Sequence, residues 1–264
     1  MDKKITIYSV MNEPYYTLGT IWLNSLKKIM DEKINKVYIA DVGLSEETKK
    51  IITNRWDNVH FLDTTTYSVP HRIHDNDWKN AVAEKTRKLL KICTEENYPV
   101  VMMDADQYIK EDFSDELYPD CDIQFCSVAE EDKPVNQDGY DLSFIGSWFV
   151  IHNDAGKSYV EKWNEKMWSI SGRHVETPAL CLTFEQYKDT LNYKLNHERV
   201  VSAAKYYDES KIIHFRSEGE QPVDLLRRIG NVENLPLDIL ENVLNYIRFE
   251  GQEKDKLGSV KGDQ

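Results

Sequence analysis

The chain has 264 residues, of which 41% are hydrophobic and 30% are charged, and this is enough to form one large domain with a substantial core. Its 46 acidic and 33 basic residues give a formal net charge of −13, which disfavours nucleic acid and anionic membrane surfaces as partners. There is no apolar run of about 18 residues, so we expect no transmembrane span, and the absence of an apolar signal segment predicts a cytoplasmic protein.

Strands and helices alternate through the first 110 residues. Short apolar or β-branched runs predict strands at 5–10, 36–41, 59–64 and 99–106, and apolar residues at helical spacing predict helices from about residue 16, from Ser45 as an N-cap, and over 78–97. The fourth strand is apolar on both faces, as in a central strand covered by helices. This order predicts an α/β fold with a doubly wound, mainly parallel sheet and helices on both faces.

The second half is less regular. It predicts strands at 122–131, 141–153 and 211–217, helices at 156–168 and 177–191, and an amphipathic helix at 235–249. That last helix offers a surface for homodimerisation or acceptor docking. The polar stretch after residue 250 predicts a frayed, flexible tail.

Acidic residues follow three of the four predicted strand ends in the first half. They are Asp41, Asp63 and the pair Asp104 and Asp106, whereas Met11 and Asn12 follow the first strand. Ligands of such sheets bind outside the carboxyl ends of the strands. An anionic ligand would be repelled from this edge unless a cation lay between them, so the pattern indicates a metal ion.

The pair at 104–106 is one of three Asp-x-Asp triplets, and a triplet alone has little specificity. The triplet at 75–77 lies in a polar loop, and the triplet at 120–122 follows a proline. Only the triplet at 104–106 closes a buried strand, where the two-residue alternation predicts both carboxylates on one side. Two carboxylates placed in this way can share a hard divalent cation with water and phosphate oxygens. The alternative is that they merely end a strand.

The segments VAEKTRKLLKI and MMDADQYI together resemble the metal-binding strand, and the helix before it, of GT-A-fold glycosyltransferases. They are most similar to family eight, the glycogenin and lipopolysaccharide galactosyltransferase group. Further similar segments follow the family's order: ITIYSVMNE, VYIADVGLSEETKK, FIGSWFVIHNDAGKSYVEKW, ETPALCLTFEQY and KIIHFRSEGEQP. The resemblance covers about residues 5–222. It implies a Rossmann-like GT-A fold, here with a C-terminal helical extension, and retaining transfer of a hexose from a nucleotide-diphosphate sugar, with a UDP-sugar favoured, to an unknown acceptor.

The resemblance also implies roles for individual residues. Asp104, Asp106 and His214 would hold Mn²⁺ or Mg²⁺, and the mixed oxygen and nitrogen ligands favour Mn²⁺. Lys85, or else Arg87, would face the diphosphate. The remaining residues expected to bind the donor are Ser9, Val10, Asn12, Asp41, Ala105, Gly146 and Ser147.

The acceptor side matches the family least well. Glu176 and Thr177 replace the usual Asp-Gln before Pro178, and the family's Lys-Pro-Trp after the late histidine is absent. Arg216 or Arg227 would have to supply that missing cation. Our candidate catalytic carboxylates are Glu176 and Asp141. Other side chains left open are Glu130, Glu131 and Asp138 as bases, His71, His74, Asp75 and Asp77 as a second metal site, and Trp78 and Trp148 as sugar-stacking or core residues.

The predicted domain boundaries follow from the resemblance. A catalytic domain spans 1–220, with a nucleotide-binding half over 1–110 and a sugar and acceptor half over 111–220. A helical extension spans 221–250, and a flexible tail spans 251–264. The alternatives are a haloacid-dehalogenase-type phosphatase, whose Asp-x-Asp strand comes first, a sugar nucleotidyltransferase, which needs a glycine-rich loop absent from SVMNEPYY, and a sugar-nucleotide-binding protein without transferase activity.

Overall fold

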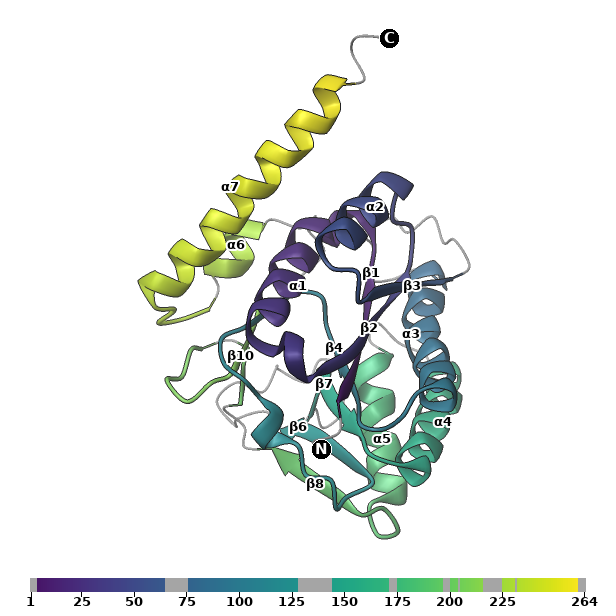
Figure 1. Ribbon diagram of the computed structural model, residues 1–264. Coiled ribbons are helices and arrows are strands. Elements are labelled where there is room, and N and C mark those ends of the chain that lie inside the picture. The colour runs from purple at the N-terminus through teal and green to yellow at the C-terminus, as the bar shows by residue number, and fades with distance from the viewer. Residues whose placement is uncertain are drawn as a thin grey trace.

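The computed structural model describes residues 4–64, 76–127, 144–170, 175–196, 200–203, 205–215, 225–230 and 232–260 (Figure 1). At 76–79, 81–82, 145, 225–227 and 250–260 it describes the backbone alone.

The fold is built on a seven-stranded sheet with the strand order β3-β2-β1-β4-β7-β6-β8. The strands are β1 (Ile5–Met11), β2 (Ile34–Asp41), β3 (Val59–Asp63), β4 (Val100–Met103), β6 (Ile123–Ser127), β7 (Phe144–Ile151) and β8 (Tyr193–Asn196). The first four are mutually parallel, β7 runs antiparallel to both of its neighbours, and β8 is parallel to β6. Since β1 to β4 run in one direction, their carboxyl ends meet at one edge of the sheet.

Helices cover both faces of this sheet (Figure 1). On one face lie α1 (Tyr16–Met30) and α2 (Glu46–Arg55), and on the other lie α3 (Asn76–Glu95), α4 (Asp154–Ser169) and α5 (Glu176–Tyr187). Trp22 of α1 and Trp163 of α4 are fully buried, one against each face. Burying each large apolar side chain contributes about 1.5–3 kcal/mol, so both helix layers are firmly attached. The predicted α/β class, with a mainly parallel, doubly wound sheet, is confirmed.

Two helix starts show how local sequence sets these bounds. Ser45 Oγ accepts a hydrogen bond from Thr48 N at 3.1 Å, as the predicted N-cap of α2. Asn153 Oδ1 accepts from two backbone N–H groups of the first turn, so α4 begins before the predicted residue 156. An added Cβ at Gly156 would lie 2.2 Å from Asp122 O, so only glycine permits this approach of α4 to the start of β6.

A small second sheet has the order β5-β10-β9. Its strands are β5 (Gln107–Ile109), β9 (Val201–Ser202) and β10 (Ile212–His214), and β10 pairs antiparallel with β5. The sequence pattern predicts β10 but neither β5 nor β9, which have three and two residues and are too short for periodicity to detect. The pairing places the residue after Asp106 directly opposite His214.

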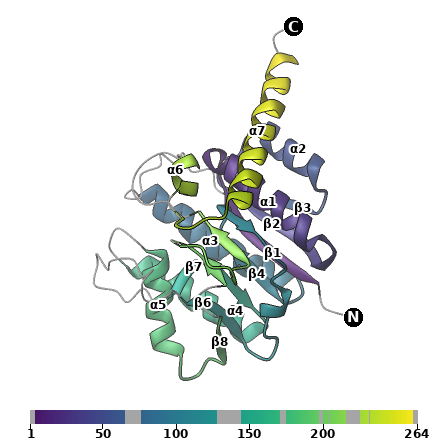
Figure 2. The ribbon, with the colours of Figure 1, turned by 90° about the vertical axis from the view of Figure 1, so that its left-hand side faces the viewer.

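The C-terminal part consists of α6 (Leu225–Gly230) and α7 (Leu237–Val260). Ile239 and Val243 of α7 share a buried cluster with Leu18 and Ile21 of α1, and the far end of α7 extends beyond the domain (Figures 1 and 2). The expectation that this helix ends at residue 249 is wrong, because the following stretch is rich in Glu, Lys and Gln and has no proline. The domain boundaries at 220 and 250 stay predictions.

The remaining differences are small. The predicted helix at 177–191 ends at Tyr187, and the predicted strands at 122–131 and 141–153 are described only over β6 and β7. Single 3₁₀ turns are η1 (Glu13–Tyr15), η2 (Asp31–Lys33) and η3 (Ser114–Glu116). None of the helices in the described part of the chain is both long enough and apolar enough to cross a membrane.

Candidate active site

The triplet Asp104–Asp106 forms the turn between β4 and β5. The expectation that it continues the strand, with strand alternation aligning the two carboxylates, is therefore wrong in its geometry. Strand β7 and the residue after β10 hold the turn from both sides: Asp104 N donates to Ser147 O of β7 at 3.0 Å, and Phe215 N donates to Asp106 O at 2.9 Å. Because its backbone is held at both ends, the turn presents both carboxylates at the carboxyl edge of the parallel strands.

His214 joins the two carboxylates from β10. Its Nε2 atom lies 3.1 Å from Asp106 Oδ1 and 3.8 Å from Asp104 Oδ2. One ligand atom from each of the three residues lies within 4.8 Å of the other two. His214 and Asp106 are buried, whereas the Asp104 side chain is 30% exposed. The structure therefore brings the three predicted metal ligands together, with Asp104 on the open side.

This donor set fits a divalent cation. Carboxylate oxygens are the ligands that Mg²⁺ and Mn²⁺ prefer, and an imidazole nitrogen suits Mn²⁺ better than Mg²⁺. The remaining ring nitrogen, His214 Nδ1, is buried and makes no hydrogen bond with any described residue. The contact with Asp106 and the surrounding packing therefore orient the ring, with Nε2 toward the carboxylates.

Lys85 of α3 lies between two carboxylates. Tyr8 in the centre of the sheet donates its hydroxyl to Lys85 O at 2.8 Å, which fixes this point of the helix. The Lys85 Nζ atom donates to Asp104 Oδ1 at 2.7 Å and to Glu176 Oε1 at 2.5 Å. Burial alone would lower the pKa of Lys85, but the two carboxylates raise it above its usual value. The side chain is therefore a buried ammonium ion.

Glu176 is the first residue of α5, and α4 holds it in place. Trp163 Nε1 donates to Glu176 O at 3.1 Å. Burial raises the pKa of the Glu176 carboxyl, and Lys85 only partly offsets this effect. A Cβ built on Gly146 would lie 3.5 Å from Glu176 Oε1, so this glycine of β7 faces the carboxylate. Glu176, predicted as catalytic, thus belongs to the same charged group as Asp104.

Arg228 of α6 belongs to the site and was missed from the sequence. Its Nη1 atom donates to Asp106 Oδ2 at 2.9 Å, and its Nη2 atom donates to Tyr15 Oη at 2.9 Å. The guanidinium carbon also lies 4.9 Å from the centre of the Tyr15 ring. The candidates named for this cation differ: Arg216 and the side chain of Arg227 lie outside the described residues. The two consecutive arginines at 227–228 were the sequence feature that could have indicated this cation. The sequence does not show which of the two points into the site.

The site holds three carboxylates and two cationic side chains, because Lys85 is shared by Asp104 and Glu176. Burial would raise the pKa of Asp106, but His214 and Arg228 lower it below its usual value. Each carboxylate in the group thus has a cationic partner: Asp104 and Glu176 face Lys85, and Asp106 faces Arg228. Buried ionic groups of this kind are costly unless paired, and they concentrate at functional sites.

The residues expected to bind the nucleoside lie along the same edge of the sheet. Val10 lies in β1 beside Ser9, whose hydroxyl is buried and makes no hydrogen bond with a described residue. Asn12 Oδ1 accepts from Tyr15 N at 3.3 Å, and Asp41 at the end of β2 pairs with Lys49 at 3.0 Å. No hydrogen bond or ion pair in the described part of the chain joins Ser9, Asn12 or Asp41 directly to the metal ligands.

The remaining predicted residues divide into two groups. Ala105 is buried within the turn, and the Ser147 hydroxyl of β7 is buried and makes no hydrogen bond with a described residue. Trp148 is fully buried against Phe113, so it is a core residue rather than a sugar platform. The exposed Arg87 pairs with the buried Glu84 of the same helix, α3. The candidates outside the described residues or side chains are Asp141, Glu130, Glu131, Asp138, His71, His74, Asp75, Asp77 and Trp78.

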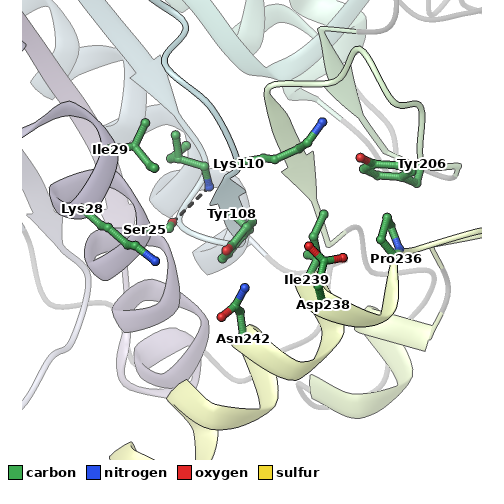
Figure 3. Close-up of a pocket in the computed structure, with 11 residues that line it drawn as sticks. Ser25, Lys28, Ile29, Tyr108, Lys110, Tyr206, Pro236, Asp238, Ile239 and Asn242 are labelled. Atoms are coloured by element: carbon green, nitrogen blue, oxygen red, sulfur yellow. Dashed lines mark hydrogen bonds between the residues drawn. The ribbon is translucent and has the colours of Figure 1, made fainter.

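A cavity of about 370 Å³ lies away from this group, between α1, β5 and the start of α7 (Figure 3). In this view Tyr108 of β5 lies between Ser25 of α1 and Asp238 of α7, and Asn242 of α7 lies below it. The cavity lining contains none of the predicted metal ligands.

Comparisons with known proteins agree with this architecture. The sequence model of the nucleotide-diphospho-sugar transferase family matches residues 42–207, and a search of curated proteins finds no match. Among solved structures, the chain is similar to the galactosyltransferase LgtC in complex with donor and acceptor sugar analogues, at 12% identity and a TM-score of 0.53 over 90% of this chain and 99% of that chain.

Two further solved structures are similar. The bifunctional glycosyltransferase WbbM gives 13% identity and a TM-score of 0.54 over 92% of this chain and 52% of that chain. The glycosyltransferase GlyE of Streptococcus pneumoniae TIGR4 gives 12% identity and a TM-score of 0.55 over 94% of this chain and 64% of that chain. At these identities the similarity concerns the fold, and it confirms the expected GT-A architecture.

Proposed function

The chain belongs to the nucleotide-diphospho-sugar transferase family, and from this premise we propose that it moves a hexose from a nucleotide-diphosphate sugar, with a UDP-sugar favoured, to a hydroxyl acceptor in a metal-dependent, retaining reaction. Membership makes it a glycosyltransferase. The cation, the nucleotide, the stereochemistry and the acceptor class belong to the proposal.

The observation that carries the proposal is the group Asp104, Asp106 and His214 at the carboxyl edge of the parallel strands. Ligands of doubly wound sheets bind at this edge. Three carboxylates, counting Glu176, face only the two cationic side chains Lys85 and Arg228 there, so a donor diphosphate would meet excess negative charge unless a further cation were bound. The ligand chemistry supports Mn²⁺ over Mg²⁺.

Asp104 and Asp106 would hold the cation through carboxylate oxygens, and His214 would hold it through Nε2. When bound, such a cation offsets the negative charge that develops on the departing diphosphate. The buried ammonium of Lys85 adds a fixed positive charge beside Asp104 and orients that carboxylate. Because Lys85 also holds Glu176, one side chain connects the proposed metal site to a carboxylate predicted as catalytic.

Retention is supported by the pairing of the carboxylates. An inverting reaction needs a carboxylate that is free to take the acceptor proton. In the described part of the site, Asp104, Asp106 and Glu176 each face a cationic side chain. Glu176 is therefore proposed to contact the sugar rather than to act as an unpaired base, and Asp141 stays a candidate for the acceptor side.

For the other predicted residues, we propose roles that follow from their positions on the sheet. Ser9, Val10, Asn12 and Asp41, at the ends of β1 and β2, are proposed to contact the nucleoside. Gly146 faces Glu176, and Ser147 O accepts from Asp104 N, the residue before Ala105, so we propose that Ala105, Gly146 and Ser147 line the diphosphate and sugar. Homodimerisation through α7 stays a prediction.

The test is incubation of the protein with Mn²⁺ and a panel of UDP- and GDP-sugars. We expect a UDP-sugar with Mn²⁺ to raise the melting temperature and to release UDP slowly, and EDTA to abolish both effects. NMR of the product's anomeric proton then reports retention or inversion. If no nucleotide sugar changes the melting temperature with or without Mn²⁺, the proposal is wrong. Donor binding without release or transfer to any acceptor would favour the binding-protein alternative.

A further inference from the structure

We propose that Arg228 couples binding of the divalent cation to binding of the donor's diphosphate. This inference rests on the proposed function and adds a residue to it. Arg228 lies in α6, outside the segment 42–207 that the family model matches. The observation behind it is a buried guanidinium in direct contact with one of the three predicted metal ligands.

The two oxygens of Asp106 face different partners. Oδ1 faces Nε2 of His214, another predicted metal ligand, at 3.1 Å, whereas Oδ2 accepts from Arg228 Nη1 at 2.9 Å. A cation can therefore bind Oδ1 while the guanidinium stays on Oδ2. One carboxylate would then lie between two positive groups.

This arrangement weakens binding of a free cation. Like charges on opposite oxygens of one carboxylate repel each other, and the buried surroundings screen them less than water does. Lys85 adds to the repulsion through its contact with Asp104. Without a donor, Arg228 and Lys85 already offset part of the negative charge of Asp104 and Asp106, which the cation needs.

A bound diphosphate makes binding of the cation more favourable. It brings negative charge that both the cation and the guanidinium attract, so the repulsion between them is offset. Arg228 uses two N–H groups on Asp106 and Tyr15, and a guanidinium has five, which leaves donors for phosphate oxygens. By thermodynamic reciprocity, the cation raises the affinity for diphosphate by the same factor as diphosphate raises the affinity for the cation.

The second contact of Arg228 keeps it in position. The Tyr15 hydroxyl accepts from Nη2 at 2.9 Å and its ring lies against the guanidinium, while Asn12 caps Tyr15 N. Tyr15 follows β1, where we propose that the nucleoside binds. Arg228 thus connects the turn at Asp106 to the loop after β1. These two contacts hold its buried side chain in place.

The test measures Mn²⁺ binding by calorimetry, alone and with saturating UDP, in the wild type and in Arg228→Gln. Glutamine keeps a hydrogen-bond donor for Asp106 and removes the charge. We expect Arg228→Gln to bind Mn²⁺ alone about threefold or more tightly than the wild type, and the enhancement by UDP to fall by about tenfold. A purely structural role would weaken Mn²⁺ binding in both conditions.

Two further variants complete the test. Arg228→Lys keeps the charge but loses the fork that reaches both Asp106 and Tyr15, so it should retain more of the enhancement than Arg228→Gln without matching the wild type. Arg228→Met removes the charge in a second way and should repeat the effect of Arg228→Gln. Arg248→Gln removes the same charge from an exposed site on α7 and should change neither constant. Unchanged coupling in the neutral variants, or weaker binding of Mn²⁺ alone, would overturn the inference. A wild type that binds neither Mn²⁺ nor UDP would instead contradict the proposed function.

Discussion

The two ends of β5 lie in very different surroundings. At its start, Asp106 is buried with His214 and Arg228 in a group of paired charges. At its end, Lys110 faces the 370 Å³ cavity and pairs with the neighbouring Glu111 at the surface. The first region has dense, buried charge, and the second has open volume with exposed polar side chains.

This difference shows which physical feature marks the functional site. Burying ionic groups costs stability unless each is paired, so a fold retains such groups chiefly where they act on something. An open volume between α1 and α7 needs no such explanation, because imperfect packing at the base of a projecting helix produces one. We therefore expect substitutions at the start of β5 to affect function strongly and substitutions at its end to affect it little.

The largest effect should follow from Asp106→Asn. The amide keeps the shape but removes one metal ligand's charge and leaves Arg228 without its counterion. We expect transferase activity to fall by more than about 100-fold and Mn²⁺ binding to be lost in steady-state kinetics and calorimetry. Asp112→Asn, at an exposed carboxylate paired with Lys33, is the matched control and should behave as wild type. Full activity in Asp106→Asn would remove the distinction between the two ends of β5.

An intermediate effect should follow from Lys85→Met. This change leaves the carboxylates of Asp104 and Glu176 facing each other without a cation, so we expect the free energy of unfolding to fall by roughly 3–5 kcal/mol at neutral pH in urea denaturation. Adding Glu176→Gln should recover part of that loss, because the repulsion disappears. Activity should fall in both proteins. A loss below about 1 kcal/mol would mean that this pair is solvated and not a buried feature of the site.

The smallest effect should follow from changes in the cavity. Lys28→Ala and Asn242→Ala remove exposed side chains from opposite walls of the cavity, and we expect each to change the free energy of unfolding by less than about 0.5 kcal/mol. The KM values for donor and acceptor should change less than about twofold. A selective rise in the acceptor KM would show that the cavity takes part in substrate binding.

The regular half of the fold could be predicted from the sequence because its signals are local. β1 and β4 are short apolar runs, and the Ser45 cap lies three residues from the N–H that it binds. The triplet at 104–106 stood out for the same reason, since it directly follows a buried strand. Its chemistry then depended on resemblance, because two aspartates alone are common.

The rest of the site could not be predicted because its contacts are distant in sequence. Arg228 meets Asp106 across 122 positions, and Lys85 meets Glu176 across 91. Neither contact produces a periodic pattern. β5 has only three residues, too few to be recognised as a strand from the sequence pattern. The pattern therefore predicts that β4 continues through the triplet, whereas the chain turns there. Identifying pairwise contacts of this kind requires coordinates or correlated substitutions among related sequences.

The two hydrogen bonds that hold the turn at Asp104 and Asp106 have a consequence for synthesis on the ribosome. The partner of Asp104 lies in β7, whereas the partner of Asp106 follows β10, and Arg228 comes later still. The parallel strands β1 to β4 emerge first and domains generally fold from the N-terminus. A nascent chain therefore acquires its four parallel strands before its metal ligands converge, and ribosome-bound intermediates ending before residue 214 should be unable to bind Mn²⁺ at this site.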